Sequence, residues 1–253
     1  MFNDWLPLLA LITTLPPLYL MQRWINRHIQ GLGLLLTGSR DSAIMIYFLA
    51  LLPGIILHEL GHWLAALLLR VPVDKLSLWP QKKRGNRVQL GSVSTGASDP
   101  LRASIIGIAP LIVGSIVILI VGQLVLGIND LGHLLLYGSW ADLWSQLLSY
   151  WQVPDFALWL YLIFAIANAM LPSESDRAAW PVMGLFLGGL TLAFLLLGGL
   201  SLVTESVKAA FLAAAGYLAY AFGLAAVVDS LFMLIIALAE ELVGRTLKKR
   251  VDY

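Results

Sequence analysis

The sequence of 253 residues contains no cysteine and has little excess charge of either sign. The lack of cysteine excludes disulfides, thiolate metal sites and cysteine nucleophiles, so histidine and carboxylate side chains are the metal ligands to expect. The net charge of +1 provides no basic field of the kind that binds nucleic acid. We therefore expect no nucleic-acid partner.

Charged residues are scarce: they form 12% of the chain, whereas hydrophobic residues form 59%. In an ordinary soluble domain about a quarter of the residues are charged. A water-soluble fold of this size could not cover its surface with so few charges, and a disordered chain has the opposite composition. The composition therefore predicts an integral membrane protein in contact with the lipid bilayer.

The apolar stretches predict an all-α polytopic membrane protein with about six transmembrane helices, because one crossing takes roughly 20 apolar residues. The expected spans are 5–21, 42–69, 101–126, 156–171, 178–200 and 207–242. Residues 1–5 lack the basic cluster of a signal peptide, so we expect the first span to be retained. Its prolines indicate a kinked or partly re-entrant segment. The last stretch fits either one extended helix or a span followed by a bent turn.

Two connecting segments have patterns of their own. Residues 71–96 alternate in part around a polar Gly-Asn turn, which predicts a short β-hairpin in a membrane cavity or at the interface, with a polar loop as the alternative. Residues 131–151 carry apolar side chains at helical spacing and predict an amphipathic helix in the headgroup layer. The stripe of that helix consists of Trp140, Trp144, Leu147, Leu148 and Trp151.

Lysine and arginine are concentrated in the loops that would face the same side as both termini in a six-span arrangement. Because positive loops stay on the cytoplasmic side, this distribution predicts a multi-pass protein of the cell membrane with cytoplasmic N- and C-termini.

The motif His58-Glu59-Leu60-Gly61-His62 lies within the second expected span. Histidines four residues apart lie on one helix face and can bind one Zn²⁺, while the intervening glutamate is placed to activate water. Three ionisable side chains in one turn would be costly if they faced lipid. The motif therefore predicts a zinc site inside the protein, whereas histidines hydrogen-bonded within a helix bundle are the structural alternative.

A catalytic zinc needs a third protein ligand. The best candidate segment is 168–177, where Asn168 precedes a proline break and the carboxylates Glu174 and Asp176. Either carboxylate could complete the site; a solvated loop is the alternative. The intramembrane carboxylate of Asp229 is a further candidate, with a helix bend or a helix–helix hydrogen bond as the structural alternative. Less suitable are loop histidines and residues at a helix end, namely His28, His133, Glu240 and Glu241.

With these motifs the sequence resembles the site-2 family of intramembrane zinc metalloproteases, in a compact form without a PDZ domain. The resemblance is carried by His58-Glu59-Leu60-Gly61-His62, by Asn168 with Asp176 eight residues later, and by Gly107-Ile108-Ala109-Pro110. It implies a catalytic core over 43–177, an N-terminal segment over 1–42 and C-terminal helices with a basic tail over 178–253.

The resemblance also implies roles for individual residues. It implies His58, His62 and Asp176 as zinc ligands, Glu59 as the catalytic base and Asn168 as a contact to substrate or transition state. Arg177 follows Asp176 where the family usually has glycine. The expected substrate is a transmembrane or membrane-associated protein, and the family places a membrane-embedded hairpin where 71–96 falls.

Two other functions share parts of this pattern. A prenyl-processing type of membrane metalloprotease also has the two-histidine motif, but takes a later glutamate as its third ligand, here Glu205 or Glu240. A protease-like scaffold or chaperone would bind membrane helices without cutting them, and the intact Glu59 argues against it.

Overall fold

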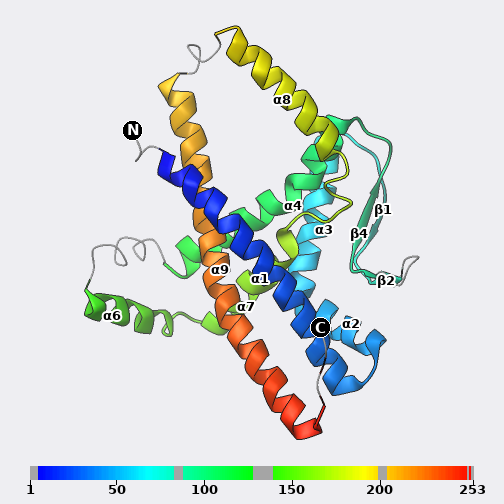
Figure 1. Ribbon diagram of the computed structural model, residues 1–253, viewed down its shortest axis with the longest axis vertical. Helices are drawn as coiled ribbons and strands as arrows, with labels where there is room; N and C mark the ends of the chain where they lie inside the picture. Colours follow the sequence, from blue (N-terminus) through cyan, green and yellow to red (C-terminus); the bar gives the residue numbers. More distant parts are fainter. Residues whose placement is uncertain (1–4, 83–87, 128–138, 199–203, 250, 252–253) are drawn as a thin grey trace.

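The computed structural model is mostly helical and describes residues 5–82, 88–127, 139–198, 204–249 and 251 (Figure 1). A nested pair of short two-stranded sheets follows the third helix. The helices are α1 Leu6–Thr37, α2 Arg40–Ala50, α3 Leu52–Leu68, α4 Pro100–Ile120, α6 Trp140–Tyr150, α7 Phe156–Met170, α8 Trp180–Leu196 and α9 Glu205–Leu247, and the π-helical turn η2 Val121–Val125 continues α4.

Two described helices are long and apolar enough to cross a membrane: α4 with η2, and α9. The bent pair α2 and α3 makes a third if it is one span. The apolar helices α7 and α8 have 15 and 17 residues and are shorter than a full crossing. The described helices therefore show two or three candidate spans, and six crossings are not shown.

Helix α1 is longer than the sequence predicted. A first span ending near residue 21 was expected, but α1 is one helix of 32 residues that continues through Pro16 and Pro17. It ends where Gly38 adopts a left-handed conformation with φ 66° and its N–H bonds to the carbonyl of Leu34. The long helix brings residues of the expected polar linker into the body of the protein.

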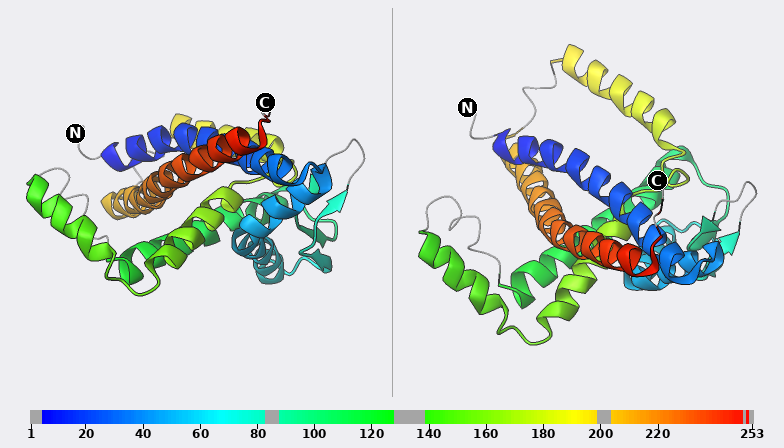
Figure 2. Two further views of the ribbon diagram at one scale, coloured as in Figure 1. Left: turned by 90° about the horizontal axis from the view of Figure 1, so that it is seen from below. Right: turned by 60° about the horizontal axis from the view of Figure 1, so that its bottom comes forward.

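Helices α1 and α9 lie side by side and run in the same direction (Figures 1 and 2). At their beginnings the Lys208 ammonium lies 5.9 Å from the Trp5 ring, and at the other end His28 Nε2 lies 3.9 Å from Glu240 Oε2. Because the pair is parallel, the chain enters α1 and leaves α9 at opposite ends. The prediction of both termini on one side thus finds no support in this arrangement.

Helix α9 is one continuous helix of 43 residues, which decides between the two possibilities left open by the sequence. The Thr204 hydroxyl accepts a hydrogen bond from the N–H of Val207 and caps its first turn. Lys248, in a left-handed conformation, ends it.

The second expected span is divided into α2 and α3, whose axes differ in direction by 71°. Pro53 lies in the first turn of α3, where its missing N–H is tolerated, but a helix running on from α2 would leave the carbonyl of Leu49 without a donor. The bend follows from this residue. It turns α3, which carries the histidine motif, into the centre of the molecule.

The expected β-hairpin is present and consists of two nested pairs. Strand β1 (Val73–Ser77) pairs antiparallel with β4 (Ser92–Thr95), and β2 (Gln81–Lys82) pairs with β3 (Val88–Gln89). The tip, 83–87, lies outside the described residues. The hairpin lies beside α3 (Figure 1).

An amphipathic helix was expected in 131–151, and α6 occupies the second half of that segment. Ser139 and Asp142 form a reciprocal capping box at its start. Trp140 and Trp151 are strongly exposed, at 88% and 75%. Residues 131–138 and the side chains of Trp144 and Leu147 lie outside the described part of the chain, and the headgroup location stays a prediction.

Helix α3 packs against α4 and α7, which places the motif between three elements. Gly54 makes this possible: a Cβ there would lie 1.9 Å from the carbonyl oxygen of Ala165 on α7. The two backbones therefore touch directly. Together with the core residues Phe48, Phe164 and Phe222, this contact fixes the position of α3.

Candidate metal centre

Helix α3 presents His58 and His62 on the same face, as the four-residue spacing predicts. Their Nε2 atoms are 3.0 Å apart. His62 is buried and His58 is partly buried, with its side chain 12% exposed. The two rings thus point their Nε2 atoms at one position.

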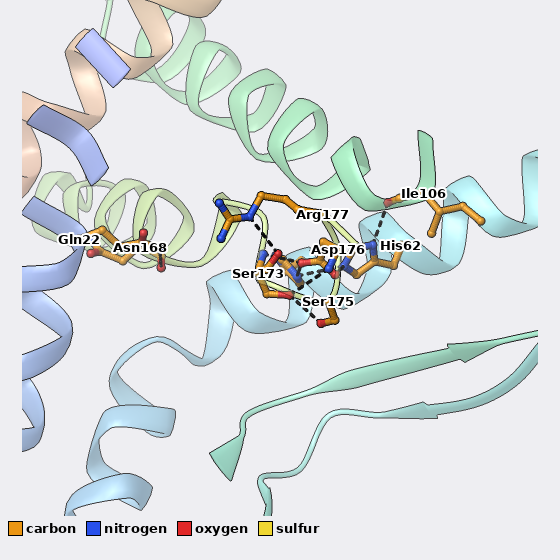
Figure 3. A network of polar contacts seen from close by, with 9 residues as sticks. Gln22, His62, Ile106, Asn168, Ser173, Ser175, Asp176 and Arg177 are labelled. Carbon is orange, nitrogen blue, oxygen red and sulfur yellow. Dashed lines mark hydrogen bonds and ion pairs between the residues drawn. The ribbon is translucent and has the colours of Figure 1, made fainter. Parts of the chain in front are cut away.

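The carbonyl of Ile106 on α4 orients His62 from behind. Nδ1 of His62 lies 2.8 Å from this oxygen, which can only accept, so Nδ1 carries a hydrogen and the lone pair of the neutral ring is on Nε2 (Figure 3). A backbone carbonyl behind the ring is the usual support of a metal-binding histidine. Nothing in the sequence pattern identified this partner, because it depends on how α4 packs against α3.

Asp176 reaches the histidines from the segment after α7. Its Oδ1 lies 3.2 Å from His62 Nε2, and its Oδ2 lies 3.6 Å from His58 Nε2. The carboxylate is held in a tight turn, since Oδ2 accepts a 2.7 Å hydrogen bond from the N–H of Ser173, and the Ser173 hydroxyl accepts one from the N–H of Asp176 (Figure 3). The spacing Ser-x-x-Asp is that of a capping box and was a readable signal.

Gly107 on α4 lets the segment come this close. A Cβ at Gly107 would lie 2.1 Å from the backbone oxygen of Asp176. Any larger residue would push the carboxylate away from α3. The small residue in the Gly-Ile-Ala-Pro sequence therefore has a defined structural role at the centre.

The three side chains fit a zinc ion. Ligands bound at the usual distances to a tetrahedral zinc are about 3.3 Å from one another. The two Nε2 atoms here are 3.0 Å apart, and the carboxylate approaches them through its two oxygens, with Oδ1 3.2 Å from His62 and Oδ2 3.6 Å from His58. One ligand atom from each residue lies within 4.8 Å of the other two, so the three residues form a candidate metal-binding group. Two imidazoles and a carboxylate suit zinc, and three protein ligands leave a fourth position open.

The environment of Asp176 keeps it ionised. Burial by itself raises the pKa of this carboxyl group, but hydrogen bonds from His58 and His62, with that from Ser173, lower it by more. The pKa therefore lies well below its usual range. An ionised carboxylate is the form that binds a metal.

Glu59 lies beside the histidines and under the hairpin. It is 6% exposed, and a Cβ at Gly91, between β3 and β4, would lie 2.6 Å from its Oε1. Glu59, both histidines and Asp176 line one cavity of about 910 Å³, together with β4 and the segment after α7. A carboxylate and the metal-ligand group thus face one cavity of mixed polar and apolar lining.

Asn168 lines the same cavity but does not belong to the metal-binding group. Its Nδ2 donates to Asp229 Oδ1 over 2.8 Å and to the carbonyl of Phe164 over 2.9 Å. This bond joins the buried Asp229 on α9 to α7, so the helix–helix hydrogen bond is confirmed, and Asp229 does not belong to the metal-binding group. The Oδ1 atom of Asn168 is buried with no hydrogen-bond partner among the described residues. Its substrate role stays a prediction.

The other candidate ligands lie elsewhere or outside the group. Glu174 is exposed and lines the cavity without joining the metal-binding group. His28 stacks on Trp24 and lies beside Glu240, and Glu241 pairs with Arg245. The carboxylate of Glu205 pairs with Lys208 at the start of α9 and is 90% exposed. His133 lies outside the described residues.

The structure is a largely helical protein with two or three described helices apolar enough to span a membrane and a candidate His–His–Asp metal site. Comparisons with family models, curated proteins and solved structures each give no match for the chain.

Proposed function

We propose that the protein is an intramembrane zinc metalloprotease of the site-2 type, which hydrolyses peptide bonds of membrane-embedded substrates. One observation carries the proposal: His58, His62 and Asp176 approach one another at ligand spacing, and Glu59 lines the same cavity. The motif resemblance supports it from the sequence side. Zn²⁺ is the cofactor that this donor set fits best.

His58, His62 and Asp176 would hold the metal, and Ile106 would keep His62 in the binding tautomer. When bound, zinc makes water more acidic and polarises the carbonyl of the scissile peptide bond. Glu59 then acts as the general base: its carboxylate accepts a proton from the attacking water and returns it to the leaving amine. Gly91 and the hairpin cover the carboxylate of Glu59 and keep it out of bulk solvent.

The hairpin provides a way to hold the substrate. A transmembrane helix has its amide groups bonded internally, so a substrate must be locally extended before it is cut. β4 lines the cavity and belongs to a sheet of two strands, and an extended segment would add to a strand edge of this hairpin through main-chain hydrogen bonds. Because these bonds involve the main chain, they would hold substrates of differing sequence.

The exposed apolar surface supports a membrane location. No described residue of α8 is buried: Leu185 and Leu196 are 81% and 78% exposed, and Leu197, which follows the helix, is 87% exposed. In water such a helix would be an aggregation site, whereas lipid covers it without cost. With lipid around α4, α8 and α9, the proposed arrangement is a multi-pass protein with up to six crossings.

The decisive variant is Glu59→Gln, which keeps the shape of the side chain and removes the base. We expect the purified variant to bind zinc as well as the wild type does, while cleavage of labelled transmembrane peptides in vesicles falls on the order of 10²- to 10⁴-fold. Zinc is measured by elemental analysis and cleavage by mass spectrometry. Glu174→Gln, an exposed carboxylate of the same cavity, is the matched control and keeps activity.

If the Glu59→Gln variant cleaved the peptides at the wild-type rate, the protease proposal would be refuted. A wild type that binds zinc but cuts none of these peptides would favour a helix-binding scaffold or chaperone instead. The prenyl-processing alternative is not favoured, because Glu205 and Glu240 lie beside Lys208 and His28 and outside the metal-binding group.

A further inference from the structure

The last turn of α7 lacks one of its own hydrogen bonds. The carbonyl of Asn168 would bond to the N–H of the residue four positions on, but that residue is Pro172, which has none. Gln22 on α1 supplies the missing donor: its Nε2 lies 2.8 Å from the oxygen of Asn168 (Figure 3). A long-range side chain thus completes the proline-broken helix end.

The side chain of the same residue is held from the other direction. Asn168 Nδ2 donates to Asp229 Oδ1 on α9, and these two residues are 2% and 0% exposed. In an interior of low dielectric, leaving either partner alone would be costly. The end of α7 is therefore fixed between α1 and α9, which both lie outside the predicted catalytic core.

The third ligand of the candidate metal centre comes shortly after this fixed point in the chain. The segment runs from Asn168 through Pro172 to the Ser173–Asp176 turn, and the turn places its carboxylate on the histidines. Both histidines come from α3, a separate element. A displacement of the end of α7 would therefore move Asp176 relative to the histidine pair.

We infer that Gln22 and Asp229 are positioning residues for the metal centre, acting through the backbone and side chain of Asn168. Gln22 lines the same cavity, but neither residue belongs to the metal-binding group. The inference rests on the metal centre of the proposed function, but not on proteolysis. It makes α1 and α9 parts of the functional unit, in contrast to the predicted core over 43–177.

The test measures metal binding by the full-length protein in detergent. Gln22→Met keeps length, volume and helix propensity and removes the donor. Gln30→Met is the matched control, because Gln30 lies on the same helix and its amide bonds to the carbonyl of Asn26 within that helix. We expect zinc affinity to fall roughly 10-fold in Gln22→Met, as for the loss of an outer partner of a metal ligand, and to stay unchanged in Gln30→Met.

Two further measurements separate positioning from general stability. Visible spectra of the Co²⁺-loaded protein report ligand geometry, and we expect a changed spectrum for Gln22→Met alone. The second measurement concerns Asp229. Asp229→Asn retains an acceptor for the Asn168 amide, and we expect it to keep the wild-type zinc affinity. Asp229→Leu has no acceptor, and we expect its zinc affinity to fall. The comparison of the two Asp229 variants tests the inference even if Gln22→Met does not fold.

The inference would be overturned if Gln22→Met, Gln30→Met and the wild type had the same zinc affinity and the same Co²⁺ spectrum. It would also be overturned if Asp229→Asn and Asp229→Leu lost zinc affinity to the same extent. A wild type that binds no zinc would overturn both this inference and the proposed function. If the variants showed the expected pattern of zinc affinities but the wild type cut no peptide, the inference would stand and the proposed protease function would be rejected.

Discussion

Asp176 shows how one side chain serves the local fold and the candidate site together. Its Oδ2 caps the turn that starts at Ser173, while Oδ1 is the atom nearer to His62. The turn therefore orients the carboxylate toward the histidine pair. Glu174, two residues earlier, is exposed instead.

This difference between two neighbouring carboxylates gives a prediction for single residues. Asp176→Ala should lower zinc affinity by more than the roughly 10- to 100-fold typical of losing an outer partner, because a direct ligand is removed. Glu174→Ala should retain full affinity. Isothermal titration with zinc measures both, and loss of binding in Glu174→Ala with retention in Asp176→Ala would reverse the assignment.

At the level of helices and strands, the centre depends on close backbone contact between helices. α3 meets α7 at Gly54, and the Asp176 segment meets α4 at Gly107. Small residues at such contacts let backbones approach where lipid offers no hydrophobic drive for association. The bend before α3 completes the arrangement, since it directs the histidine helix between α4 and α7.

Gly107→Ala tests this contact. The added methyl group meets a backbone oxygen, which cannot rotate away, and we expect this overpacking to lower the free energy of unfolding by about 2 kcal/mol. Gly188→Ala on α8 is the control, because a Cβ there has open space. Its higher helix propensity should leave stability unchanged or raised by up to about 1 kcal/mol.

Thermal unfolding in detergent and zinc titration check this pair. Gly107→Ala should unfold at a lower temperature and bind zinc more weakly, because the backbone of Asp176 is displaced. Equal melting temperatures and zinc affinities for both variants would show that the segment is not packed on Gly107 as described.

In the molecule as a whole, α1 and α9 form a parallel pair against α4 and α7 (Figure 2). The pair consists of the first and last described helices and packs against one side of the predicted catalytic core. Gln22 and Asp229 extend this packing to Asn168, which lines the cavity of the centre. Removing either terminal helix would expose the end of α7.

The parallel direction can be tested by a disulfide, and the absence of cysteine gives a clean background. A Cβ at Gly216 would lie 3.6 Å from the Cβ of Pro7, within the roughly 3.5–4.5 Å that a disulfide requires. Pro7→Cys with Gly216→Cys should therefore crosslink under mild oxidation, as read by mass spectrometry of tryptic peptides.

The control pair is Pro7→Cys with Gly244→Cys, in which the second position lies near the other end of α9. This pair should stay reduced. Crosslinking of the control pair, with none in the test pair, would indicate an antiparallel arrangement and contradict the structure.

Several features were predictable because they depend on local spacing. Histidines four apart share a helix face, alternation around a Gly-Asn turn gives a hairpin, and long apolar runs give helices; all three are present. The end of the first helix and the unbroken α1 were not predictable. Whether a helix continues past Pro17 and two arginines depends on the neighbour against which it packs, here α9.

Composition and helical periodicity are properties of the chain alone, and they were enough to predict a membrane-type helical protein with His58, His62 and Glu59 on one helix. The folded molecule was needed to choose between Asp176 and Glu174 as the carboxylate near the histidines, and to give Asp229 its partner Asn168. These contacts join residues far apart in the chain, and they arise where glycines let backbones touch and where Pro172 leaves a carbonyl for Gln22.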